Sequence, residues 1–277
     1  MTHAPSPRRP PSAVTDTRNA TNSPASAANA DNHVHLPHHP LPEYYGTGDA
    51  QGRERFLRAT FDSTAVDYNR LERILGLGTG SWYRRQALNR AGLHAGMDVV
   101  DVGMGTGLVA HEILRVTGEP RRLVGVDPSP GMMNEARLPP EVVCRLGSAE
   151  AIPVPDASAD FLVMGYALRH IADFAAACAE FRRVLRPGGR LLVLEITRPE
   201  SRWATALLKV YMRGAIPLVA RLVARAEASP MLWRYYWDTI EACVPPAEVM
   251  TTLAGHGLVG VERHVELGIF SEYRARG

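Results

Sequence analysis

One strand-like run and the turn that follows it constrain the fold of this 277-residue chain more than any other feature. The run, Val99–Val102, is short and mostly apolar. The turn after it alternates glycine with other residues, at Gly103, Gly105 and Gly107. Because glycine has no Cβ, the backbone can bend sharply here and come close to a ligand. A second apolar run, Leu123–Val126, ends in a single carboxylate, Asp127.

A helix that begins near Thr106 would direct free backbone N–H groups at the space above this turn, and such groups favour a negatively charged ligand group. The carboxylate of Asp127, at the tip of the next strand, can accept two hydrogen bonds from a ribose diol. Together these features predict a cradle for a nucleoside cofactor. Asp127 has a second interpretation, in which it only caps a turn with Ser129.

The pattern after this turn alternates strands with helices. Apolar runs predict strands over 98–102, 122–126, 142–145, 161–165 and 190–195. Helical spacing predicts helices over about 107–117, 130–136 and 173–185, and Pro187-Gly188-Gly189 is predicted to be a turn that leads into the fifth strand. Such alternation builds a parallel sheet covered by helices on both faces.

Both flanks of this region are mainly helical. Before it, two helices are predicted over Arg53–Tyr68 and Trp82–Ala91, separated by the glycine-rich Gly76–Gly80. After it, residues 201–243 are predicted to be helical with interruptions at Pro217 and Pro230, and one more helix covers Pro246–His256. Two closing strands, Leu258–Glu266 and Gly268–Ala275, are joined so tightly that they must be antiparallel.

Composition limits the classes of protein that fit. Residues 1–50 are rich in Pro, Ala, Ser, Asn and His, so we predict a disordered tail there and one folded domain over 51–277. The net charge of +2 does not favour a nucleic-acid partner. Three scattered cysteines indicate neither a disulfide framework nor a metal site, and they favour the reducing cytoplasm. No apolar run reaches the roughly 18 residues of a membrane span. The histidines of the tail are interpreted as solvated rather than metal-binding.

The glycine turn reads G-x-G-x-G, whereas a dinucleotide-binding fold carries G-x-G-x-x-G. A sheet of five parallel strands that closes with an antiparallel hairpin also does not suit the two-half dinucleotide fold. It does suit the fold of S-adenosylmethionine (SAM) methyltransferases.

The chain resembles class I SAM-dependent methyltransferases, and within them the ubiquinone/menaquinone C-methyltransferase family. Three segments carry the resemblance: VVDVGMGTG with GVDPSPGMM, GSAEAIPVPDASADFLVMGYALRHIAD, and RVLRPGGRLLVLEITRP. The spacing of WRYYWDTIEACVPPAEVM before the last helix also matches. The resemblance implies an α/β, Rossmann-like sheet of seven strands, mostly parallel with a C-terminal antiparallel hairpin, helices on both faces and a helical lid over 198–245.

The resemblance also implies which residues hold SAM. The glycines and Thr106 would contact its methionine part, Asp127 its ribose, and Ser148 and Ala149 its adenine. Gly165 takes the place of a serine that contacts the cofactor in the family. Each position also has a plain structural interpretation; Ser148, for example, could be an ordinary loop residue.

Catalytic residues are expected just after the fourth strand. The family's Phe-Gly-Leu-Arg-Asn reads Tyr166-Ala-Leu-Arg169-His170 here, and its Arg is thought to help activate a phenolic acceptor. The cation of Arg169 could lower the pKa of such a phenol. His170 replaces the family's Asn and could act as a general base. The structural alternatives are a salt bridge from Arg169 to Asp173 and a polar packing role for His170.

The N-terminal part of the family pattern is poorly kept. Tyr68 matches a family tyrosine and is expected to close over the cofactor, but Asn69 replaces an Asp. Glu72 and Gly80 replace the usual Asn and His. These departures put the substrate, rather than the cofactor, in question.

The expected acceptor is small and lipophilic or aromatic. Residues 201–243 combine an apolar helical face with a basic edge, which fits either a core face or peripheral contact with the inner face of a membrane. Trp233, Tyr235, Tyr236 and Trp237 could line an aromatic pocket or pack a core. The leading hypothesis is C-methylation of a polyprenyl quinol or related phenolic lipid. N-methylation of a phospholipid amine, methylation of a specialised aromatic metabolite, and SAM binding without catalysis are alternatives, and the sequence does not indicate an oligomeric state.

Overall fold

The computed structural model describes residues 50–75, 78–223 and 229–277, all in the compact unit Val34–Gly277. The tail predicted over 1–50 therefore lies outside the described residues, except for Ala50, where a helix begins.

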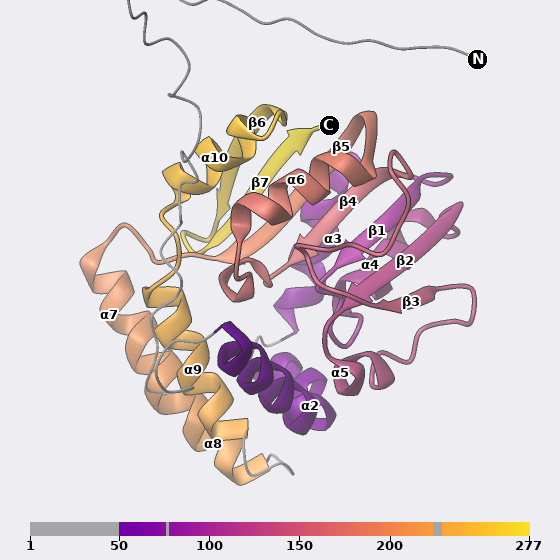
Figure 1. Cartoon of the computed structure of the whole chain (residues 1–277). Helices are drawn as coiled ribbons and strands as arrows, with labels where there is room; N and C mark the ends of the chain where they lie inside the picture. Colours follow the sequence, from indigo (N-terminus) through magenta and orange to yellow (C-terminus); the bar gives the residue numbers. More distant parts are fainter. Residues whose placement is uncertain (1–49, 76–77, 224–228) are drawn as a thin grey trace, which may run out of the picture. The chain divides into compact units, whose positions relative to one another are not determined.

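A seven-stranded sheet in the order β3-β2-β1-β4-β5-β7-β6 forms the centre of the described part (Figure 1). Its strands are β1 (Asp98–Val102), β2 (Arg122–Asp127), β3 (Val143–Leu146), β4 (Ala159–Gly165), β5 (Leu185–Ile196), β6 (Val259–Glu266) and β7 (Phe270–Arg276). The first five run parallel, and β7 pairs antiparallel with both β5 and β6. The predicted fold class and the closing hairpin are confirmed.

Helices cover the sheet and form a separate layer beside it. They are α2 (Ala50–Leu75), α3 (Thr79–Arg90), α4 (Leu108–Thr117), α5 (Pro130–Asn134), η1 (Leu168–His170), α6 (Phe174–Val184), α7 (Arg202–Val210), η2 (Tyr211–Ala215), α8 (Ile216–Val223), α9 (Ser229–Glu241) and α10 (Pro246–Gly255). None of the described helices is both long and apolar enough to cross a membrane.

Alternate residues of each central strand build two separate cores. Val100 and Val102 of β1 pack on one face of the sheet with residues of α6 and α10. Val99 packs on the other face with residues of α3 and α4. Strands buried on both faces read as continuous apolar runs, which is why the sequence pattern located them well.

A third core joins α2 to α7, η2, α8 and α9. It is rich in aromatic side chains and also contains aliphatic residues: Leu71, Met212, Ile216, Leu232, Tyr235, Tyr236, Trp237 and Ile240. This core and the helices around it form the helical layer, which contains most of the lid predicted over 198–245.

Two predicted breaks differ in the structure. Pro187-Gly188-Gly189 is not a turn before β5 but an irregularity within it, because Ala159 pairs with Leu185 while Phe161 pairs with Arg190. The helix predicted to stop at Pro217 continues through it. The wide turn of η2, just before this proline, changes the backbone hydrogen-bonding pattern where proline cannot donate.

Candidate active site

The glycine turn after β1 has the backbone conformation that the sequence predicts. Gly103, Gly105 and Gly107 have φ values of 69°, 53° and 77°, a region that L-residues with a side chain rarely adopt. A Cβ on Gly103 would lie 2.6 Å from the Cβ of Ala167, so the turn is also too tight there for a side chain. The turn is fixed to β2 by the Gly103 and Met104 N–H groups, which both donate to the Val126 carbonyl.

Asp127 ends β2 and joins two loops. One carboxylate oxygen accepts the N–H of Gly105 at 2.7 Å, and the other accepts the N–H of Ser129 at 2.8 Å. Burial raises the pKa of this carboxyl to about 6, although the two N–H bonds oppose the rise. Asp127 is therefore mainly ionised at neutral pH, and both oxygens keep a lone pair for a ligand. The predicted turn cap with Ser129 is present, and it is compatible with ligand binding.

Asp101 is a buried carboxyl that the sequence analysis missed. It lies in β1 two residues before the glycine turn and is completely buried. Neither of its oxygens makes a hydrogen bond of good geometry among the described residues, and only the backbone N–H of Ala110 in α4 is near enough to oppose the rise in its pKa. Burial, together with the negative charge of Asp127, raises its pKa to about 8. Because a buried polar group without a good hydrogen bond is costly, this carboxyl favours a ligand that donates or carries positive charge. The sequence does contain a signal for this residue, because Asp101 is the single acid within the apolar run Val99–Val102.

Helix α2 is fixed to both loops by side chains. The Thr106 hydroxyl donates to the side-chain oxygen of Asn69. Asp62 lies earlier in the same helix. Its carboxylate accepts from the Ser129 hydroxyl and from the Gly131 N–H, the latter at 2.8 Å. The replacement of the family's Asp by Asn69 therefore still leaves an acceptor for Thr106. Asp62 was not singled out from the sequence, and nothing in its local pattern marks it.

Glu72 and Gly80, the other two residues of this region that differ from the family pattern, lie next to each other in the structure. Glu72 forms an ion pair with Arg84 at 3.0 Å, and Arg84 is buried. A Cβ on Gly80 would lie 2.2 Å from the carboxylate of Glu72. Glycine at this position thus leaves the space that the Glu72–Arg84 pair occupies.

The residues expected around the adenine follow β3. Ser148 forms an isolated bridge with Ala151, and Ala149 is buried within the core on the α6 side. The preceding Gly147 donates its N–H to the Asp127 carbonyl, so the loop is held beside the end of β2.

Gly165 ends β4 in a place where a larger residue would not fit. An added Cβ would meet the Cγ2 atom of Val109 at 2.5 Å, and Val109 belongs to α4. The following Tyr166 has a φ of 62°, an unusual conformation for a residue with a bulky side chain. The close approach of Val109 therefore leaves little room here for the serine that the family resemblance implies.

Arg169 forms a buried ion pair with Glu195 and not with Asp173, so that structural interpretation was wrong. Asp173 instead caps α6 by accepting the Ala176 N–H. Glu195 is completely buried and also accepts the N–H groups of Arg169 and Ile196. Burial works against the charged guanidinium, but the neighbouring Glu195 carboxylate leads to a raised pKa for Arg169, which stays protonated.

The guanidinium of Arg169 lies 4.9 Å above the ring centre of Tyr236. The Tyr236 hydroxyl donates to the Tyr68 hydroxyl at 3.1 Å. Burial raises the pKa of both phenols, and the positive charge of Arg169 opposes that rise in each. Arg169 therefore acts electrostatically on phenolic groups in this region, although Glu195 partly compensates its charge.

His170 lies among aromatic rings. Its ring stacks with that of Tyr235 at 5.8 Å between centres, and Nδ1 is 3.4 Å from the Tyr235 hydroxyl. Phe61 meets it edge-on at 5.2 Å. Of the predicted aromatic cluster, Tyr235, Tyr236 and Trp237 are buried, whereas the side chain of Trp233 lies outside the described part.

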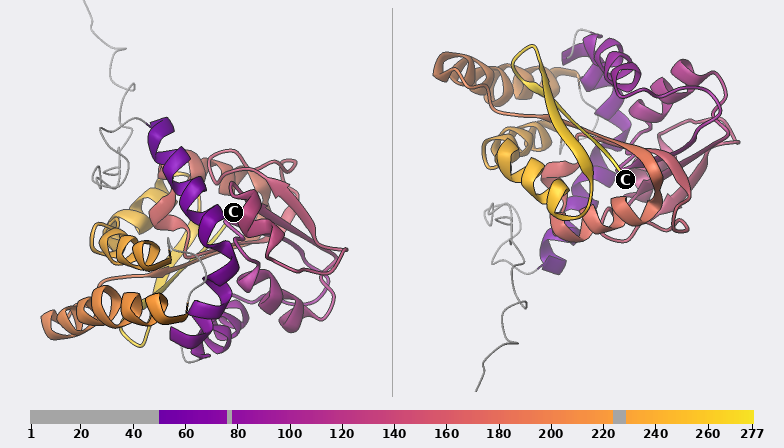
Figure 2. Two further views of the ribbon diagram at one scale, coloured as in Figure 1. Left: turned by 90° about the horizontal axis from the view of Figure 1, so that it is seen from below. Right: turned by 90° about the horizontal axis from the view of Figure 1, so that it is seen from above.

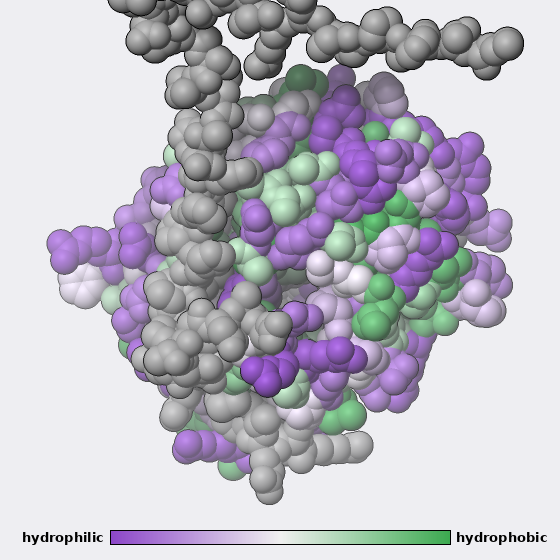
Figure 3. All heavy atoms as spheres, viewed as in Figure 1, coloured by the Kyte–Doolittle hydropathy of each residue, from purple (hydrophilic) through white to green (hydrophobic). Residues whose placement is uncertain are grey.

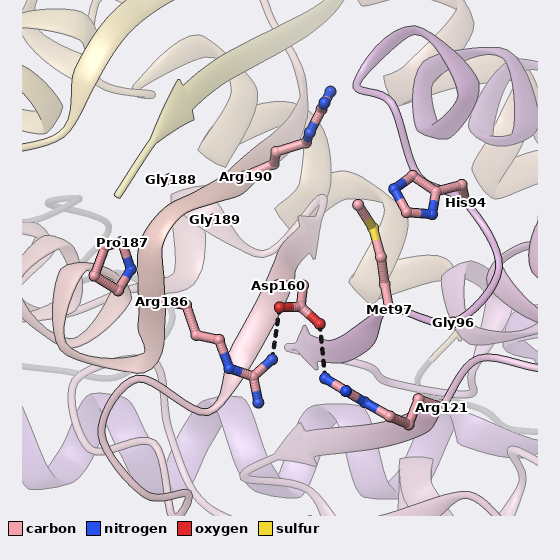
Figure 4. Close-up of a pocket in the computed structure, with 10 residues that line it drawn as sticks. All are labelled: His94, Gly96, Met97, Arg121, Asp160, Arg186, Pro187, Gly188, Gly189 and Arg190. Carbon is pink, nitrogen blue, oxygen red and sulfur yellow. Dashed lines mark hydrogen bonds and ion pairs between the residues drawn. The ribbon is translucent and has the colours of Figure 1, made fainter.

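A pocket of about 420 Å³ lies at the opposite, amino ends of the strands (Figure 4). Asp160 accepts there from Arg186 at 2.6 Å and from Arg121 at 3.2 Å. Of the other charged residues that line the pocket, Arg190 donates to the Ala91 carbonyl. The pocket is remote along the strands from Gly103 and Asp127. Ligands of open α/β sheets bind at the carboxyl ends, where the glycine turn lies.

Comparison with known proteins decides the family. The family model described as the ubiE/COQ5 methyltransferase family matches residues 49–272. The chain belongs to this family. It is a methyltransferase, and S-adenosylmethionine is its methyl donor.

Two relatives of this ubiE/COQ5 methyltransferase illustrate the match. A demethylmenaquinone methyltransferase of Deinococcus radiodurans is 35% identical over 227 residues, which cover 80% of this chain and 92% of the relative. A ubiquinone/menaquinone biosynthesis C-methyltransferase of Hahella chejuensis is 31% identical over 195 residues, covering 68% and 77%.

Solved structures confirm the fold of the ubiE/COQ5 methyltransferase. A SAM-dependent methyltransferase from Thermotoga maritima has a TM-score of 0.57 at 21% identity, covering 79% of this chain and 99% of that one. Another from Aquifex aeolicus has a TM-score of 0.51 at 22% identity, covering 70% and 88%.

Proposed function

We propose that this enzyme transfers the methyl group of SAM to a ring carbon of a polyprenyl quinol or a related phenolic lipid. Relatives that are named for menaquinone or ubiquinone methylation, at 31% and 35% identity, support this acceptor class. The phospholipid-amine and specialised-metabolite alternatives, and a role without catalysis, are not favoured by these matches.

The residues at the carboxyl ends of β1 and β2 fit SAM. The carboxylate of Asp127 would accept from the ribose hydroxyls, and the buried carboxyl of Asp101 suits the positive charges of the cofactor. Gly103, Gly105, Thr106 and Gly107 would surround its methionine part.

Further contacts would complete the cofactor site. Ser148 and Ala149 would flank the adenine, Gly165 would approach through its backbone, and Tyr68 would close the site from α2. SAM supplies an electrophilic methyl group for direct displacement. The chain has to align the acceptor, exclude water and manage the phenol proton.

The acceptor side of the site would be the aromatic surface around Arg169 and His170. The observation that carries this assignment is the guanidinium of Arg169 above the Tyr236 ring, where its charge opposes the raised pKa of two tyrosine hydroxyls. An acceptor phenol beside these rings would likewise be made more acidic, and its phenolate directs electron density to the ring carbon. His170 would accept the phenol proton, directly or through the Tyr235 hydroxyl. Attack by the ring carbon would break the S–CH3 bond and release S-adenosylhomocysteine, and loss of the hydrogen of that carbon as a proton would restore the aromatic ring.

The test is methyl transfer from radiolabelled SAM to a demethylmenaquinol with a shortened prenyl chain, dispersed in detergent. The expected product carries the label on a ring carbon, identified by mass spectrometry and NMR. Label on an oxygen atom, label only in phospholipid amines, or tight SAM binding with no transfer would each contradict the proposal.

We also propose that the enzyme makes peripheral contact with the membrane that contains such a lipid. The α7–η2–α8 segment would make this contact.

A further inference from the structure

The α7–η2–α8 segment carries a row of exposed apolar side chains. The row, here called the apolar stripe, comprises Trp203 (87% exposed), Leu207 (73%), Val210 (69%), Leu218 (60%) and Leu222 (78%). Successive members are three, four or eight residues apart, so they recur on one face of the helical segment. Figure 1 and both views of Figure 2 place α7 and α8 at the edge of the fold, away from the sheet.

The wide turn of η2 keeps the stripe on one face. From Val210 to Leu222 the members advance in steps of four residues, with Gly214 at the middle step. In an ordinary α-helix of 3.6 residues per turn, repeated steps of four would rotate the row around the helix. The wider turn at Tyr211–Ala215 takes up part of that rotation. The opposite face, with Met212 and Ile216, packs into the aromatic core.

The charge on this segment has one sign. The sequence has no Asp or Glu from Ser201 to Ala226. Lys209 and Arg213 point to α9, where they pair with Glu241 at 3.0 Å and Asp238 at 3.8 Å. The other two described basic side chains, Arg202 and Arg221, are exposed, and no carboxylate of the described residues lies within ion-pair distance of either.

Exposed apolar residues on other elements do not form such a row. On the face seen in Figure 3, hydrophilic residues are interspersed among the hydrophobic ones. Exposed apolar residues elsewhere, such as Leu146 of β3 and Leu267 of the β6–β7 turn, belong to no such helical row.

We propose that the apolar stripe lies on the surface of an anionic lipid bilayer, with Arg202 and Arg221 against lipid head groups. An apolar helical face flanked by basic residues suits the interface of such a bilayer, where the apolar side chains enter the acyl boundary and Arg meets anionic head groups. The indole of Trp203 is suited to the same depth. The inference rests on the proposed function, because the acceptor would be dissolved in that bilayer, and the inner face of the same helices contacts the aromatic core.

The test measures vesicle binding without any methyl transfer, so it succeeds or fails separately from the proposed reaction. The full chain is mixed with vesicles of phosphatidylcholine alone or of phosphatidylcholine with phosphatidylglycerol, and bound protein is quantified by flotation. We expect stronger binding to the anionic vesicles and a decrease with added salt. The stripe variant, Trp203→Ser with Leu207→Ser and Leu222→Ser, should lose at least about tenfold in partitioning.

A matched control carries Leu146→Ser and Leu267→Ser, which also remove exposed apolar side chains but should leave binding unchanged. Arg202→Gln with Arg221→Gln should weaken binding to anionic vesicles only. Circular dichroism and a thermal melt verify that each variant folds. Equal binding by the stripe variant and the control would overturn the proposal. So would stripe-dependent self-association in sedimentation without vesicle binding, because a second copy of the chain would then cover this face.

Discussion

Buried polar groups are held in different ways in the two halves of the proposed active site. At the cofactor loops, Asp127 is fixed by backbone N–H groups of Gly105 and Ser129, which lie 22 and 2 residues away. In the helical layer, side chains hold one another: Tyr68 meets Tyr236 across 168 residues. Backbone donors are present whatever the sequence, so the position of Asp127 depends on a few local groups, although Asn69 and Asp62 of α2 also bond to these loops. The helical layer depends on many side chains that are distant in the chain.

Loss of the buried Arg169–Glu195 pair in the helical half should have the largest effect. Arg169→Ala leaves a buried carboxylate without its partner, which should cost about 3–5 kcal/mol of unfolding free energy and abolish methyl transfer. Urea unfolding and the labelled-methyl assay measure the two effects. Arg169→Met combined with Glu195→Leu should recover most of the stability while remaining inactive. If that double variant regains activity, Arg169 has only a structural role. As a control, Arg137→Ala removes an exposed ion pair with Glu135 and should cost under about 1 kcal/mol.

Asp127→Ala tests the backbone-held half. Loss of the charged acceptor should weaken SAM binding at least tenfold, equivalent to roughly 1.5–3 kcal/mol, as measured by calorimetry. Asp160→Ala is the matched control, because it removes a carboxylate at the opposite end of the same sheet and should leave SAM affinity unchanged. Unchanged affinity in Asp127→Ala would remove this residue from the cofactor site.

Gly165→Ser tests how tightly α4 packs against the end of β4. The new side chain would clash with Val109, and overpacking of this kind should destabilise the fold by about 1–3 kcal/mol. Adding Val109→Ala should restore stability by opening the space. A single variant as stable as the parent in thermal unfolding would show that α4 can shift.

The smallest expected effect is a proton released when SAM binds. Since the pKa of Asp101 is raised to about 8, this carboxyl carries a proton at pH 7 in the protein without cofactor. The folded state holds this proton more tightly than the unfolded state. The resulting contribution to the free energy of unfolding is therefore complete below about pH 4 and is lost as the pH rises through about 8. A cationic cofactor beside Asp101 lowers that pKa, so binding at pH 7 should release close to one proton.

Calorimetry in buffers of different ionisation enthalpy detects that proton, and Asp101→Asn should abolish it. A wild-type binding heat that is independent of the buffer would contradict the prediction. Below pH 6, protonation of Asp127 should weaken SAM binding further, by roughly tenfold at pH 5.

The sequence predicted the strand and the glycine turn of the proposed cofactor half well because their signals are local. Val99–Val102 is apolar on both faces of a buried strand, and the glycines that follow it have the positive φ values that only glycine adopts easily. Asp101 could have been found in the same way, as an acid within that run. The partner of Arg169 could not, because Asp173 lies at helical spacing while Glu195 reaches Arg169 only through the pairing of β4 with β5.

The alternating sheet, the closing hairpin, the glycine turn and the place of Asp127 could all be predicted from the sequence, because each follows from backbone geometry and short-range periodicity. The folded structure was needed to show that Asn69 and Asp62 of α2 hold the two loops, that Glu195 holds Arg169, and that η2 keeps the apolar stripe on one face. These contacts form between side chains that are distant in the sequence, and they depend on how the helices and strands pack. No local sequence pattern specifies them.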